Sequence, residues 1–366
     1  MGFKCGIIGL PNVGKSTIFN ALTQSTIAEA ANYPFATIEP NIGRVPVLDE
    51  RLEIIGKISK SEKVIPTFMD FVDIAGLVKG ASKGEGLGNK FLSHIREVEA
   101  IAHVVRCFID PNITHTLNTI DPLRDVGIIE TELLLADLES LNKQKNSISK
   151  RIKGGDKDAE KIDKIISKLI SKIERGEQIR DLGYDKETSL IPQRLGLMST
   201  KPLMYICNVE ENSIKSGNQL SQKIQQKALR EGNKAVLVSA SFEQQISMLK
   251  TNEEKKLLLE DTGIKDPALS RVISNGYELL NLQTFFTSGP KETRAWTVKI
   301  NSTASQAAGK IHTDFEKGFI RAETINYNDF VKYNGEKGSK ESGKMRPEGK
   351  DYKVQDGDIF HFRFNV

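Results

Sequence analysis

The stretch GLPNVGKST, residues 9–17, has the spacing G-x-x-x-x-G-K-[ST] of a phosphate-binding loop. It follows an apolar run and precedes the helical pattern STIFNALTQ, which is the context that this motif needs. Backbone N–H groups of such a loop surround phosphates, Lys15 is expected to reach the β- and γ-phosphates, and the Ser16 hydroxyl is expected to ligate Mg²⁺. The residues predicted to contact a nucleotide here are Asn12, Val13, Gly14, Lys15, Ser16 and Thr17.

A second element supports a nucleotide site. FVDIAG, residues 71–76, is an apolar run that ends in D-x-x-G. Asp73 is expected to hold Mg²⁺ through water, and the Gly76 amide to contact the γ-phosphate. Between the two motifs, NYPFATIEPN contains Thr37, which offers a second hydroxyl to Mg²⁺, although an ordinary loop threonine is the plainer alternative.

Hydrolysis needs a group that orients the attacking water. The residue after D-x-x-G is often a glutamine with that role, but here it is Leu77. Among the histidines, His103 lies in an apolar run and is expected in the core. His94, after a Gly-rich stretch, and His115, in the polar segment DPNITHT, remain as candidates.

The elements that position these residues are apolar runs at 3–9, 67–74, 100–108, 201–208 and 234–241. Near-continuous apolar runs suit parallel strands covered on both faces. Their alternation with helical segments predicts a doubly wound α/β sheet, and we expect the nucleotide-binding domain to span residues 1–282.

A helical hairpin interrupts this sheet. The pattern is helical from Glu130 to Arg180 and is broken at Gly154, Gly155 and Asp156, which predicts two antiparallel helices. The sheet resumes at Lys201, so the insertion is expected at about 124–200. Between positions 143 and 180 there are twelve Lys or Arg against six Asp or Glu. This excess suggests a polyanionic partner, with solvated helix faces as the plainer alternative.

After residue 282 the pattern changes to a small α+β domain, expected at 283–366. Short strands at 294–300 and 358–366 flank a helix at 304–315. The stretch 332–353 is also basic, with seven Lys or Arg against four Asp or Glu.

Composition limits the class of protein. The 366 residues carry a net charge of +4 and are 38% hydrophobic, which fits a globular protein of more than one domain. No apolar run approaches the roughly 20 residues of a membrane helix, and no secretory cleavage site follows the N-terminus, so a cytoplasmic protein is expected. Each cysteine lies in or beside an apolar run and is expected to be a buried thiol: Cys5, Cys107 and Cys207.

Together these motifs resemble the YchF family of Obg-like ATPases. The resemblance rests on GFKCGIIGLPNVGKSTIFNALT, ANYPFATIEPN and FVDIAGLVKGASKGEGLGNKFLSHIRE, while RAWTVKI and QAAGKIHTDFEKGFIRAE resemble the family's C-terminal TGS domain. It implies a G-domain-like P-loop NTPase fold with a helical hairpin, and a ubiquitin-like β-grasp domain. It also implies an enzyme that uses ATP at least as well as GTP and associates with ribosomes. The family's catalytic histidine follows a strand in a mobile loop, and His115 matches that position.

The resemblance bears on the base. GTPases read guanine with N-K-x-D, whereas the family carries N-x-x-E, and here Asn208 is followed by Val209 and Glu211. A guanine-reading Asp accepts from N1–H and the 2-amino group together, and adenine has neither donor. A longer Glu beside an apolar Val breaks that fit, which loses about 1–3 kcal/mol of discrimination. The segment VSAS is expected to pack the base through Ser239, Ala240 and Ser241.

Three functions stay open from the sequence. The first is a Mg²⁺-dependent ATPase that switches between nucleotide states, binds ribosomes through the basic hairpin and the TGS domain, acts as a monomer and has no membrane partner. The second is a GTPase factor in ribosome assembly similar to Obg proteins. The third is a nucleotide-stabilised RNA- or ribosome-binding module with little turnover, against which the intact Lys15, Ser16 and Asp73 argue.

Overall fold

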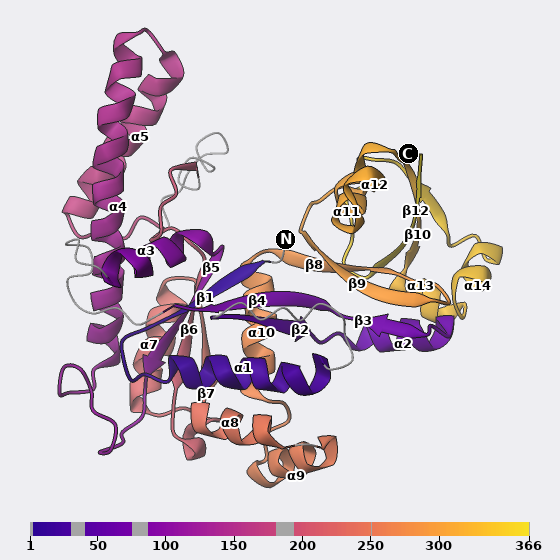
Figure 1. Cartoon of the computed structure of the whole chain (residues 1–366), viewed down its shortest axis with the longest axis horizontal. Coiled ribbons are helices and arrows are strands. Elements are labelled where there is room, and N and C mark those ends of the chain that lie inside the picture. The colour runs from indigo at the N-terminus through magenta and orange to yellow at the C-terminus, as the bar shows by residue number, and fades with distance from the viewer. Residues whose placement is uncertain (1–2, 31–40, 75–86, 181–193, 250, 366) are drawn as a thin grey trace.

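The computed structural model of the chain describes residues 3–30, 41–74, 87–180, 194–249 and 251–365. Within them lie two six-stranded sheets and a projecting pair of helices (Figure 1). No helix in these ranges is both long enough and apolar enough to cross a bilayer. The three cysteines are buried and free, as predicted.

The first sheet carries the phosphate-binding loop. Its strands, in spatial order, are β2 (Ile42–Val47), β4 (Thr67–Asp73), β1 (Lys4–Ile8), β5 (Ala100–Arg106), β6 (Leu203–Asn208) and β7 (Lys234–Val238). All neighbouring pairs are parallel except β2 with β4. The predicted doubly wound sheet is confirmed. The antiparallel edge strand β2 was not predicted, because Arg44 and Pro46 interrupt its apolar pattern.

Helices cover this sheet. Helix α1 (Lys15–Ala30) packs along β1, β2 and β4, and α10 (Ala268–Leu279) packs along β5, β6 and β7. The core between them is one apolar cluster from all the central strands. Among the described residues, the other helices of this unit are α3 (Leu87–Glu97), α7 (Gln219–Arg230), α8 (Ala240–Met248) and α9 (Asn252–Thr262), with a 3-10 turn, η2 (Glu211–Ser213), after β6.

The predicted hairpin is formed by α4 (Pro122–Lys153) and α5 (Lys157–Glu174). Asp121 and Asp156 cap the two helices by accepting backbone N–H bonds. Apolar residues at helical spacing form a second core between the helices. At about 1.5 Å per residue, the 32 residues of α4 span roughly 48 Å, and the hairpin projects from the sheet (Figure 1).

The second sheet has the strand order of a β-grasp domain. Its strands are β11 (Arg346–Glu348), β10 (Phe319–Asn326), β12 (Asp358–Phe364), β8 (Leu282–Thr287), β9 (Glu292–Lys299) and β3 (Lys63–Ile65). A parallel β8–β12 pair lies at the centre, and α11 (Ala304–Ile311) packs on the sheet. The other helices here are α12 (Thr313–Lys317), α13 (Tyr327–Lys332) and α14 (Glu336–Glu341).

Strand β3 comes from the N-terminal part of the chain. Together with helix α2 (Glu50–Ser59), it connects β2 to β4, yet it pairs in parallel with β9 of the second sheet. Leu52 and Ile55 of α2 are buried against Phe286 and Phe330 of the second unit. The expected division into 1–282 and 283–366 therefore leaves out a segment, residues 50–65, that packs with the C-terminal unit.

Candidate nucleotide site

The phosphate-binding loop lies between β1 and α1 and requires glycine at two positions. Gly9 has φ +155° and Gly14 has φ +97°, and residues other than glycine rarely adopt these backbone angles. A Cβ at Gly9 would lie 2.5 Å from the Val104 carbonyl oxygen, and one at Gly14 would overlap the Asn208 amide. The loop thus packs closely against the ends of β5 and β6.

Lys15 is a buried cation at this loop. Its Nζ donates to the Leu10 carbonyl oxygen at 2.7 Å, inside the loop itself. Burial lowers the pKa of Lys15 to about 8, and the charge of Asp73 opposes part of that shift. A phosphate group would give the ammonium a charged partner in place of a carbonyl.

Ser16 and Asp73 meet although 57 positions separate them. Ser16 Oγ donates to Asp73 Oδ2 at 3.1 Å. Asp73 Oδ1 is buried and has no hydrogen-bond partner within the described part of the chain. A buried carboxylate oxygen with a free lone pair beside a hydroxyl fits Mg²⁺, which prefers oxygen ligands. Thr37, Gly76 and Leu77 lie outside the described residues.

Asn208, the last residue of β6, joins the phosphate-binding loop to the start of α8. Its Nδ2 donates to the Val13 carbonyl oxygen at 2.9 Å, and its Oδ1 accepts from the Ala240 N–H at 3.0 Å. The side chain is buried, and both its amide nitrogen and its amide oxygen have hydrogen-bond partners. Asn208 therefore connects the phosphate-binding loop, β6 and α8 at the carboxyl edge of the sheet.

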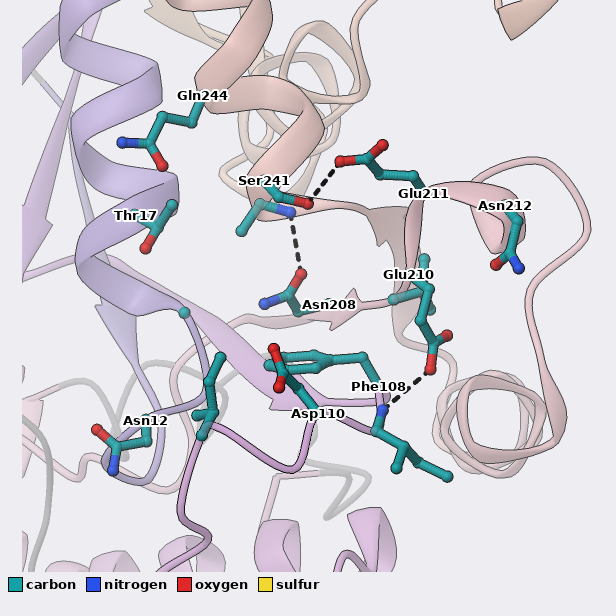
Figure 2. A pocket seen from close by; sticks show the side chains of 15 residues that line it. Asn12, Thr17, Phe108, Asp110, Asn208, Glu210, Glu211, Asn212, Ser241 and Gln244 are labelled. Atoms are coloured by element: carbon teal, nitrogen blue, oxygen red, sulfur yellow. Dashed lines mark hydrogen bonds between the residues drawn. The ribbon is translucent and has the colours of Figure 1, made fainter.

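A pocket of about 760 Å³ opens at this edge (Figure 2). Of the predicted residues, the following line it: Asn12, Gly14, Thr17, Asn208, Val209, Glu211, Ala240 and Ser241. Val13 and Ser239 are buried behind it. Its position outside the carboxyl ends of parallel strands is where open α/β sheets bind ligands.

One wall of the pocket was not predicted. It is the loop after β5, which contributes Phe108, Ile109, Asp110 and Ile113. Buried Arg106 builds this loop by donating to the carbonyl oxygens of Phe108, Asp110 and Ile113. An arginine at the end of an apolar strand was the signal in the sequence, because a buried guanidinium needs several acceptors nearby.

The two carboxylates after Asn208 are both engaged. Glu210 accepts from the Ile109 N–H at 3.0 Å and from Asn218 Nδ2 at 2.8 Å. Glu211 Oε1 accepts from Ser241 Oγ at 3.1 Å and from Gln245 Nε2 at 2.9 Å. In Figure 2 the Glu211 carboxylate is directed toward Ser241 and Glu210 toward the loop after β5.

His115 is buried, and both its ring nitrogens have partners. Nε2 lies 2.8 Å from Asp125 Oδ2, and Nδ1 accepts from the Leu117 N–H at 3.1 Å. His115 is not among the residues that line the pocket. The Thr114 carbonyl oxygen, one residue earlier, accepts from Asn12 Nδ2 at 3.1 Å, which links this segment to the phosphate-binding loop.

The other histidines differ. His103 is buried in β5, where burial lowers its pKa to about 3, in agreement with the predicted core position. His94 is exposed on α3.

Two family profiles match the chain. One, for the C-terminal domain of YchF GTPases and described as a protein of unknown function, covers residues 282–365. The other, described as a 50S ribosome-binding GTPase, covers residues 4–144.

Relatives match over the whole length. A Haemophilus influenzae protein named "Ribosome-binding ATPase YchF" is 56% identical over 366 residues, with 100% of both chains covered. A Bacillus subtilis protein of the same name is 49% identical over 368 residues, again with 100% of both covered. The solved structure of the Schizosaccharomyces pombe YchF GTPase is 38% identical and has a TM-score of 0.89, over 99% of this chain and 98% of that one.

Proposed function

Because the chain belongs to the YchF family, we propose that it is a Mg²⁺-dependent ATPase that binds ribosomes and changes state with its nucleotide. The full-length relatives are named ribosome-binding ATPases. The observation that carries the enzymatic part is the hydrogen bond between Ser16 and Asp73, together with the buried ammonium of Lys15, next to a pocket of about 760 Å³.

The phosphates are proposed to lie over the N-terminus of α1. There the loop N–H groups and Lys15 bind the β- and γ-phosphates, and Lys15 exchanges its bond to Leu10 for one to phosphate. Ser16 and Asp73 would hold Mg²⁺, with Thr37 as a further hydroxyl ligand. When bound, this ion neutralises charge that develops on the phosphate oxygens. The Gly76 amide is assigned to the γ-phosphate.

Adenine is the base that the pocket suits better. Guanine presents N1–H and a 2-amino group, which need an acceptor where GTPases have Asp. Here the acceptor, Glu211, is held by Ser241 and Gln245. Adenine has neither of these two donors, so it places no N1–H or 2-amino group beside Val209 and the backbone of residues 239–241 that would need Glu211 as its acceptor.

His115 is proposed to orient the attacking water, since Leu77 has no polar group for that task. In the arrangement described it is paired with Asp125, so catalysis requires this pair to open when ATP is bound. The bond from Asn12 to Thr114 offers a route, because a change in the phosphate-binding loop reaches the residue next to His115 directly.

The ribosome is proposed to contact the hairpin and the C-terminal domain. Lys161, Lys164 and Lys168 are exposed along α5, and Lys337, Lys340 and Lys344 are exposed at and just after α14. Ribosomal RNA supplies the phosphates that such surfaces attract. We further propose a monomer that acts in the cytoplasm, where ribosomes are found.

Side-by-side calorimetric titration with Mg-ATP and Mg-GTP tests the proposal. We expect ATP to bind no more weakly than GTP and to be hydrolysed, and Lys15→Ala to abolish measurable binding of both. Preference for GTP by more than tenfold, about 1.4 kcal/mol, would overturn the ATPase assignment in favour of a GTPase. Binding without turnover, with or without ribosomes, would leave only a nucleotide-stabilised binding module.

A further inference from the structure

Glu211 is held by two residues of α8, one of which lies outside the pocket. Ser241 and Gln245 are one helical turn apart on α8, and both donate to the same oxygen of Glu211. Ser241 lines the pocket, whereas Gln245 is exposed and is not among the lining residues. Gln245 therefore donates to a carboxylate that lines the pocket, although Gln245 itself does not line it.

We propose that Gln245 is a positioning residue that sets base specificity by holding Glu211 against α8. This inference rests on the proposed preference for adenine nucleotides. In this position Oε1 of Glu211 is occupied by Ser241 and Gln245, so the carboxylate cannot offer both of its oxygens to guanine. The N1–H and 2-amino donors of GTP lose their water partners on entry and are not both given a replacement. Unpaired donors of this kind weaken binding, whereas adenine, which lacks them, is unaffected.

The neighbouring contacts show why Gln245 is needed. Ser241 Oγ also lies 3.0 Å from Ser239 Oγ, and where Ser241 is the donor of that bond its single proton is not available to Glu211. Glu210 cannot take the role of guanine acceptor, because Ile109 and Asn218 occupy its two oxygens. Glu211 is thus the carboxylate that can be released, and the amide of Gln245 is its unshared donor.

An exposed hydrogen bond such as that of Gln245 can matter here because specificity is the difference between the free energies of binding ATP and GTP. A hydrogen bond at the surface contributes little to folding, on the order of 0.5–1.5 kcal/mol, but the same amount changes a ratio of two affinities by about twofold to twelvefold. Loss of the Gln245 bond removes part of the restraint on Glu211 and lets its carboxylate reach toward the base. ATP gains nothing from that movement.

The test compares four variants with the wild type. Gln245→Leu removes the donor, and Gln245→Lys keeps one. Gln222→Leu makes the same amide-to-apolar change on the exposed face of α7 and serves as the matched control. The double variant Gln245→Leu with Glu211→Ala removes the released carboxylate. Dissociation constants for Mg-ATP and Mg-GTP, and kcat with ATP, are measured for each.

We expect Gln245→Leu to bind GTP about threefold to tenfold more tightly, with ATP affinity and kcat within about twofold of wild type. Gln245→Lys and Gln222→Leu should keep the wild-type ratio of the two affinities, and the double variant should lose the gain. If Gln245→Leu leaves the ratio unchanged, or if the gain persists without Glu211, the proposal is wrong. A wild type that itself prefers GTP would instead refute the proposed function, so the two failures are distinguishable.

Discussion

At the scale of single residues, the site contains charged groups with buried atoms that lack either a charged partner or a hydrogen-bonding partner within the described part of the chain. Lys15 is buried with only a carbonyl oxygen as its partner, and Asp73 keeps one buried oxygen without a partner in the described residues. Burying a charge without a charged partner costs free energy, which a phosphate at Lys15 and a cation at Asp73 would recover. Such groups are typical of ligand sites rather than of structural cores.

The lowered pKa of Lys15 predicts a pH dependence of ATP binding. The protonated lysine binds phosphate, and burial lowers its pKa in the free loop to about 8. Above that pH the free protein must take up a proton to bind, so the Kd for ATP should rise with pH, by at most about tenfold per pH unit. Titrations at pH 7, 8 and 9 measure the effect. An affinity that stays constant to pH 9 would contradict it.

His115→Ala is predicted to lower kcat by at least about tenfold while the Kd for ATP stays within about threefold, because a group that orients water acts mainly in the transition state. Single-turnover kinetics separate the two quantities. Since His115 also pairs with buried Asp125, thermal unfolding of the variant must be measured too. Normal turnover would move the assignment to His94 or to an activating partner.

These residues differ in how well sequence reveals them. Lys15, Ser16 and Asp73 could be assigned because motif spacing fixes their chemistry, and the structure brings them together. The wall formed by Phe108 and Ile109 could not, since its shape depends on the backbone contacts of Arg106. Sequence also could not show that Asn208 braces the site with both ends of its amide.

At the scale of elements, the hairpin is where sequence predicts most reliably. Its apolar residues recur at helical spacing and a Gly-Gly-Asp turn separates the two runs, so both helices and their contact follow from local pattern. Strand β2 is the opposite case. Its pairing with β4 comes from the rest of the sheet, which compensates for Pro46 at an edge.

Reversal of three charges on α5 tests the hairpin as a docking element. Lys161, Lys164 and Lys168 changed to Glu should reduce co-sedimentation with ribosomes at low salt, because contacts to phosphate release counterions and weaken steeply with salt. ATP hydrolysis by the free variant should not change. Reversal of Lys223, Lys256 and Lys265, which are exposed outside the hairpin, is the matched control. Equal pelleting of both variants would make the hairpin a structural insert.

At the scale of the whole molecule, the two sheets are joined through the connection between β2 and β4. Helix α2 and strand β3 leave the first sheet after β2, complete the second sheet, and return at β4. Several bonds hold this segment in place, including the ion pair from Arg51 to Asp356 at 2.6 Å and the bond from Ser61 to the Gly289 carbonyl oxygen at 2.7 Å. The segment that packs with the C-terminal unit leads directly into β4, and β4 ends at Asp73 of the nucleotide site. The C-terminal unit is therefore connected to the nucleotide site through this strand.

Sequence could not place this segment. The spacing of Leu52 and Ile55 shows that α2 has an apolar face, but the partners of that face, Phe286 and Phe330, lie more than two hundred positions away. A division of the chain into domains by composition therefore assigns α2, like its neighbours in the chain, to the N-terminal domain. The contacts assign it to the C-terminal unit instead.

Ile55→Ala should therefore destabilise the C-terminal unit, although residue 55 precedes that unit by more than two hundred positions. Ile55 is fully buried in the cluster with Phe286 and Phe330, so its truncation should cost about 2–5 kcal/mol. Ile54, the next residue of the same helix, is 38% exposed, and Ile54→Ala should cost far less. Hydrogen exchange resolves where the loss occurs.

In Ile55→Ala, the amides of β8 and β9 should exchange faster than in wild type, while those of β1 and β5 in the first sheet should keep most of their protection. This difference is expected because α2 packs on the second sheet and not on the first. Equal loss of stability in the Ile54 and Ile55 variants, or faster exchange confined to the first sheet, would show that residues 50–65 do not belong to the C-terminal unit.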